Sequence, residues 1–83
     1  MNLYSIQDIK TGFLHPWLSD NDNSATRAFD SMLGSDQMMS KYPNDFRLFR
    51  IGEFNPVNAA IIPCVPTVHI VDAASILRGN DNG

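Results

Sequence analysis

Apolar and polar residues near the start of the chain follow a strand-like pattern. Residues 2–8, NLYSIQD, predict a first β-strand. A short turn follows and ends at Gly12, which suits a left-handed backbone position, so residues 13–18 are expected to return as a second, antiparallel strand. Pro16 lacks an N–H, which places this second strand at a sheet edge or ends it early.

The apolar positions take up helical spacing after residue 24. One stripe, repeating at intervals of three and four residues, comprises Ala25, Ala28, Phe29, Met32 and Leu33. The preceding residues 19–24, SDNDNS, are rich in side chains that cap helix N-termini, and Gly34 is the expected end of the helix. Residues 35–42, which include Met38 and Met39, are expected to form a loop.

The second half of the chain contains the clearest strand, residues 45–54. Alternate strand residues share a face, so Phe46 and Leu48 are expected to pack together against the helix. Residues 55–58 predict a turn, residues 59–64 a returning strand, and residues 67–71 a further extended segment. A short helix at AASIL, with Asp72 as a candidate cap, and a frayed end at RGNDNG complete the prediction.

These elements predict an α+β fold. We expect a small three- to four-stranded, mainly antiparallel sheet in a ββαββ-like order, with one helix packed on one face and an extended C-terminal tail. The expected division is an α+β domain over residues 1–66 and a tail over residues 67–83. An apolar fraction of 43% with eight aromatic residues suffices for one modest core.

Charge and length exclude some classes of protein. Proteins that condense nucleic acid are usually basic, whereas this chain has a net charge of -3, which excludes that role but leaves room for a local basic patch. No apolar run approaches the roughly 18 residues of a membrane span. The start of the chain also lacks a signal sequence, so we expect a protein without membrane contact that acts in the cytoplasm.

Catalytic and metal-binding patterns are weak. His15 and His69 have no serine, cysteine or carboxylate at the spacing of a catalytic triad. Residues 20–24 resemble the start of a calcium loop, but Ala25 and Ser31 stand where such a loop requires glycine and glutamate. The single cysteine, Cys64, is expected as a small apolar filler. We therefore expect no enzyme, no catalytic residue, no metal and no cofactor.

The second face of the strand over residues 45–54 is the main candidate site. It carries Arg47, Phe49 and Ile51, and sheet faces with exposed arginine and aromatic side chains bind single-stranded nucleic acids by stacking. The candidate nucleic-acid-binding residues are Arg47, Phe49, Arg50, Tyr4 and Lys10, and Trp17 is a further aromatic neighbour. The alternative is that this face is buried under the tail or in a homodimer. Candidate residues for a dimer or partner interface are Ile51, Val68, Ile70, Met38 and Met39.

Several short motifs resemble one viral family. They are Leu3-Tyr4-Ser5-Ile6, Gly12, Asn21-Asp22 leading to Ala25-x-Arg27-x-Phe29, Pro43-x-Asp45-Phe46, and Ile51-Gly52-Glu53-Phe54. In order and spacing they resemble the small nonstructural protein of gokushoviruses, the tailless single-stranded DNA phages of the Microviridae. The resemblance covers about residues 3–54. The family usually has an acidic, glycine-containing turn next, whereas this chain has residues 55–59, NPVNA.

The resemblance implies a non-capsid phage protein that acts in the host bacterial cytoplasm during genome replication, at the stage of single-stranded DNA synthesis. Expected partners are single-stranded or duplex DNA, a replication protein or host factor, and a second copy of the chain in a homodimer. The alternative hypothesis is a module that binds a host or phage protein without contacting DNA. A scaffolding role is a third, minor hypothesis.

Overall fold

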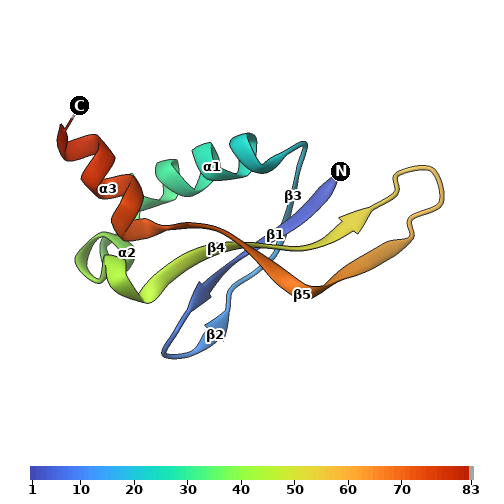
Figure 1. Ribbon diagram of the computed structural model, residues 1–83, viewed down its shortest axis with the longest axis horizontal. Helices are drawn as coiled ribbons and strands as arrows, with labels where there is room; N and C mark the ends of the chain where they lie inside the picture. Colours follow the sequence, from blue (N-terminus) through green and yellow to red (C-terminus); the bar gives the residue numbers. More distant parts are fainter. Residues whose placement is uncertain (83) are drawn as a thin grey trace.

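The protein is described by a computed structural model over residues 1–82, in which five strands form one antiparallel sheet (Figure 1). The strands are β1 (Asn2–Asp8), β2 (Gly12–Phe13), β3 (Trp17–Ser19), β4 (Phe46–Phe54) and β5 (Ile61–Asp72). Their order is β2-β1-β4-β5, and β3 pairs with the other end of β1. The helices are α1 (Asp22–Ser35), α2 (Gln37–Lys41), the 3-10 turn η1 (Pro43–Asp45) and α3 (Ala73–Asn82). The α+β prediction is confirmed, with one strand more than the expected upper number.

The first hairpin follows the prediction closely. β1 has the predicted bounds, and Gly12 adopts a φ of +112°, a value that favours glycine because it lacks a Cβ. The predicted strand over residues 13–18 is split into β2 and β3. Residues 14–16, which include Pro16, lie between these two strands and belong to neither. Both pieces still pair with β1, at opposite ends of it.

The helical region contains one correct and one wrong prediction. Asn21 caps α1, since its Oδ1 accepts a hydrogen bond from the Ser24 N–H at 2.9 Å. The helix continues past Gly34 to Ser35. The expected loop over residues 35–42 is wrong: Asp36 caps a second helix, α2, by accepting from the N–H groups of Met38 and Met39 at 2.9 and 3.1 Å.

The core lies between α1 and the helix-facing side of the sheet. α1 contributes Ala25, Phe29 and Leu33, and the sheet contributes four buried residues: Tyr4, Ile6, Phe46 and Leu48. The predicted packing of the helix stripe on Phe46 and Leu48 is therefore confirmed. Complete burial of an aliphatic or aromatic side chain of this size contributes about 1.5–3 kcal/mol.

The C-terminal segment belongs to the same core. The expected boundary between residues 66 and 67 falls inside β5, which is one strand rather than two segments separated by Pro63 and Pro66. Helix α3 begins at Ala73, which is fully buried, and Ile76 and Leu77 pack against the core. The predicted helix at AASIL is present and extends through Asn82 rather than fraying after residue 77; Gly83 lies outside the described residues. The tail thus completes the domain.

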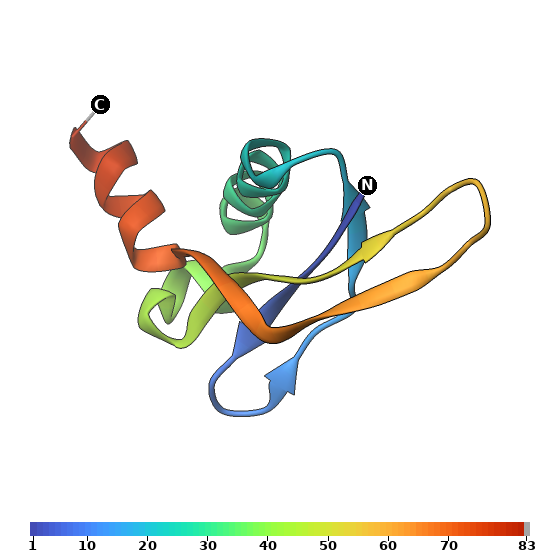
Figure 2. The same ribbon diagram turned by 45° about the vertical axis from the view of Figure 1, so that its right-hand side comes forward.

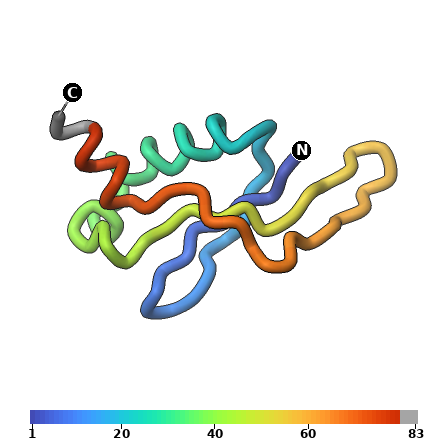
Figure 3. Tube along the Cα trace, in the orientation of Figure 1, coloured from blue at the N-terminus to red at the C-terminus, as the bar shows by residue number. Residues whose placement is uncertain are grey.

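The β4–β5 hairpin extends beyond the helices as an arm, which we define as residues 51–67 (Figures 1 and 2). β1 pairs with the base of the arm at Gly52 and Glu53, and the arm is two-stranded beyond Phe54. β4 bulges at Ile51, since Tyr4 pairs with Arg50 but Leu3 pairs with Gly52. β5 bulges more strongly opposite this point, between Pro63 and Val68, where the Val65–Pro66 peptide bond is cis. Figure 3 shows the two segments of the arm running side by side to the turn at its end.

A polar cluster joins the start of α1 to the sheet. The Tyr4 hydroxyl donates a hydrogen bond to Asp22 Oδ1 at 2.6 Å, and Arg50 Nη1 lies 3.4 Å from the same oxygen. Burial, reinforced by the hydrogen bond to the Asp22 carboxylate, raises the pKa of the Tyr4 phenol above its ordinary value of 10.0. Asp22 therefore links β1, β4 and α1.

The base of the arm depends on the absence of a side chain at Gly52. A Cβ there would lie 2.9 Å from the Ile62 carbonyl oxygen and 3.5 Å from Pro63 Cα, both backbone atoms of the paired strand. We expect Gly52→Ala to lower the free energy of unfolding by about 1–3 kcal/mol. The matched control is Gly34→Ala in α1, where nothing lies within 4 Å and stability should rise by up to about 1 kcal/mol. Urea denaturation measures both, and equal changes in the two variants would contradict this packing.

The raised pKa of Tyr4 predicts a loss of stability at alkaline pH. The folded state holds the phenolic proton more tightly than the unfolded state, so its stabilisation is complete below about pH 10 and disappears as pH rises through the folded pKa. Tyr4→Phe should be less stable at neutral pH by about 1 kcal/mol, since it loses the hydrogen bond to Asp22. The difference between the two proteins should shrink above about pH 10. Urea midpoints measured across this range test the prediction, and parallel pH profiles would contradict it.

Candidate functional site

One face of the sheet carries no helix in the part of the chain that the structure describes. α1 and α3 lie on the opposite side (Figures 1 and 2). The strand registers define this open face, because Ser5 pairs with Phe49 and Gln7 pairs with both Arg47 and Phe13. Arg47 and Phe49 therefore share it, as predicted from the alternation in β4.

Three rings form a row across the open face, on β2, β4 and β5. We call Phe13, Phe49 and His69 the aromatic row. Phe49 is central: its ring centroid lies 5.6 Å from that of Phe13 and 5.5 Å from that of His69, and both contacts are edge-to-face. Phe13 and His69 are exposed and Phe49 is half-buried. Edge-to-face packing holds the rings in place and leaves part of each ring accessible.

Arg47 and His69 share one carboxylate, that of Asp72. Asp72 Oδ1 lies 2.7 Å from His69 Nε2 and 3.7 Å from Arg47 Nε. The side chains of Arg47, His69 and Asp72 are 43%, 49% and 44% exposed, so solvent weakens both interactions. The row is consequently flanked by one guanidinium and one carboxylate rather than by a purely basic patch.

Sequence reasoning placed two of these residues correctly and missed two. Arg47 and Phe49 share the open face, but Phe13 and His69 were not among the candidates. Their position depends on the registers of β2 and β5 against β1 and β4. The available signal was the hairpin around Gly12, which brings Phe13 opposite β1.

Three candidate nucleic-acid residues lie away from this row. Tyr4 is 0% exposed in the core on the helix side, so its assignment to the exposed stacking face is wrong. Arg50 pairs with Tyr4 in the ladder and faces Asp22 on the same helix side. Lys10 is exposed in the β1–β2 turn, where it borders a hollow with Met38 at the α2 end of the molecule.

The candidate partner residues are scattered rather than clustered. Met39 is buried in the core, so a partner surface that includes it is wrong, whereas Met38 is 59% exposed on α2. Ile70 is half-buried and packs against the core. Ile51 lies at the β4 bulge, and Val68 is exposed in β5 opposite Arg50.

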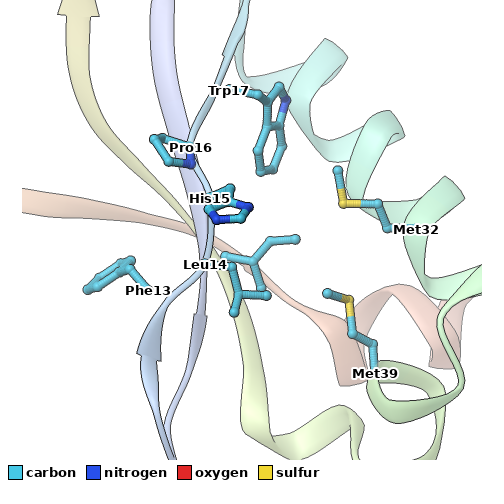
Figure 4. Close-up of a pocket in the computed structure, with 8 residues that line it drawn as sticks. Phe13, Leu14, His15, Pro16, Trp17, Met32 and Met39 are labelled. Atoms are coloured by element: carbon cyan, nitrogen blue, oxygen red, sulfur yellow. The ribbon is translucent and has the colours of Figure 1, made fainter.

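A separate groove lies on the helix side of the sheet, between residues 14–17 and helices α1 and α2. Its volume is about 550 Å³. Figure 4 shows Leu14, His15 and Trp17 facing Met32 and Met39 across it, while Phe13 points away from the two methionines. The groove is thus largely apolar, and it shares only Phe13 with the aromatic row.

In residues 1–82, no three His, Cys, Asp or Glu side chains are grouped to hold a metal ion. None of the helices in this range is long and apolar enough to cross a membrane.

Comparison with known proteins gives one clear relationship. Neither curated proteins nor solved structures provide a match to the chain. The family described as "Phage ORF5 protein" matches residues 1–76. This range includes β1 to β5, the whole open face and the first part of α3. The chain therefore belongs to the phage ORF5 protein family.

Proposed function

We propose that this phage protein is a gokushovirus (Microviridae) nonstructural accessory protein, without enzymatic activity, that binds single-stranded DNA during genome replication in the host bacterial cytoplasm. The observation that supports this proposal is the aromatic row with Arg47 beside it on an uncovered sheet face. Unpaired bases stack on exposed rings, and every base has a face suited to this contact. Bases in duplex DNA are already stacked, so the row favours single strands.

Magnitudes limit the affinity of one copy. Stacking contributes roughly 1–3 kcal/mol per base, while association costs about 4–15 kcal/mol. A row of three rings accommodates few bases, and the chain as a whole is acidic, at -3. We therefore expect weak binding that depends mainly on stacking and becomes strong only when two sites act together.

A second candidate function is binding of a replication protein or host factor without DNA contact. The position of Asp72 favours it, because this carboxylate neutralises Arg47 and repels phosphate groups. The two functions differ in one measurement. Absence of binding to any single-stranded oligonucleotide, even at low ionic strength, would exclude DNA as the ligand and leave a protein partner.

Loss of the central ring should weaken DNA binding. We expect Phe49→Leu to reduce affinity for a single-stranded oligonucleotide by about tenfold or more, because it removes the stacking surface and keeps an apolar side chain. The matched control is Tyr42→Leu, since Tyr42 is an exposed aromatic residue that follows α2, away from the row. Fluorescence anisotropy measures both affinities, and circular dichroism verifies folding. Equal losses in the two variants would contradict a site at the aromatic row.

Neutralising Asp72 should strengthen DNA binding. Asp72→Asn removes a negative charge beside the row and frees Arg47 to contact phosphate, while asparagine still suits the residue before a helix. We expect a several-fold higher affinity at low salt and a steeper decrease of affinity with salt. The control is Asp36→Asn, which makes the same charge change at the α2 cap. Equal gains in both variants would indicate a general charge effect rather than contact at the row.

A further inference from the structure

We infer that the β4–β5 arm is the interface through which two copies of this chain form a two-fold dimer. The arm is the most exposed apolar part of the described structure. Val57, Ile61, Ile62 and Val65 are 92%, 64%, 58% and 86% exposed. Beyond Phe54 the arm is a two-stranded ribbon without support from β1, and such a ribbon is marginally stable by itself in water. An exposed apolar cluster of this kind marks an interaction surface.

Both faces of the arm carry exposed apolar side chains, and Glu53 at its base is its one charged residue. Phe54 pairs with Ile61 and Glu53 pairs with Ile62, so Ile61 and Ile62 point to opposite sides of the ribbon. The helices cover neither side there, because the arm extends past them (Figures 1 and 2). Folding of one copy therefore leaves these side chains in water.

The charge distribution indicates a second copy as the occupant. Glu53 at the base is the one charged residue of the arm, and residues 54–67 contain no charged side chain, although the whole chain has a net charge of -3. This segment offers no cation to a phosphate backbone and no ion-pair partner to a charged protein surface. Two identical arms, by contrast, meet along residues 54–67 through uncharged side chains, with Glu53 left at the base of each arm, and contact around a two-fold axis satisfies both copies at once.

The prolines determine how the two arms meet. Pro63 and Pro66 lack an N–H, so this half of the β5 edge is poorly suited to adding another strand by backbone hydrogen bonds. The contact is therefore made by side chains, with Ile62 and Val65 packed against their counterparts. Such a dimer carries two aromatic rows, which provides the bivalent site that weak stacking requires. The dimer itself does not depend on DNA binding.

Sedimentation velocity without DNA tests this inference. We expect the unmodified protein to be a dimer and Ile62→Asp or Val65→Asp to raise its dissociation constant by about tenfold or more, yielding monomers with an unchanged circular dichroism spectrum. The control is Ile9→Asp, an exposed isoleucine in the β1–β2 turn, which should remain dimeric. Anisotropy with a short oligonucleotide reports separately on the aromatic row, so the two proposals fail independently.

Three results would overturn the inference. The first is an unmodified protein that stays monomeric at every accessible concentration. The second is a dimer that the arm substitutions leave intact or weaken no more than Ile9→Asp does. The third is dissociation of the dimer by Leu14→Asp, which would place the contact in the apolar groove rather than between two arms.

Discussion

The structure depends on burial of the α1 stripe against one face of the β1–β4 pair. The register pairs Ile6 with Leu48 and Tyr4 with Arg50, which brings the buried side chains of both strands to the same side. A shift of one residue in β4 would turn Phe46 and Leu48 outward and bring Arg47 and Phe49 under the helix. Burial of a guanidinium without a partner costs several kcal/mol, so the register is strongly determined. The same register places Arg47 and Phe49 on the open face.

Local periodicity was sufficient for the elements that make this contact. The bounds of β1, the stripe of α1 and the buried face of β4 all follow from short-range spacing. Helix α2 was missed because its five residues are too few to show a helical period, although Asp36 is a cap signal. β5 was divided because Pro63 and Pro66 resemble strand breaks, whereas a bulge accommodates that region within one edge strand.

The candidate site was likewise predicted only as far as the spacing within one strand allows. Arg47 and Phe49 were placed correctly because they lie on one strand. Arg50, which was also a candidate for this site, lies on the face of Leu48, as the alternation along the strand requires. Phe13 and His69 come from other strands, so their approach to Phe49 depends on registers that a single sequence does not determine. Tyr4 was misplaced for this reason too: its aromatic ring suggested stacking, but the pairing of β1 puts it in the core.

Asp72 determines the charge beside the face on which we propose that DNA binds. It lies at the junction of β5 and α3, and its carboxylate interacts with both Arg47 and His69. Exposed ion pairs of this kind contribute only about 0–1 kcal/mol, so in the proposed complex with DNA a phosphate group would replace Asp72 beside Arg47 at little energetic cost. The rings, in contrast, keep their positions through packing within the sheet. In the DNA-binding function that we propose, stacking on the aromatic row therefore contributes more than the charge of Arg47.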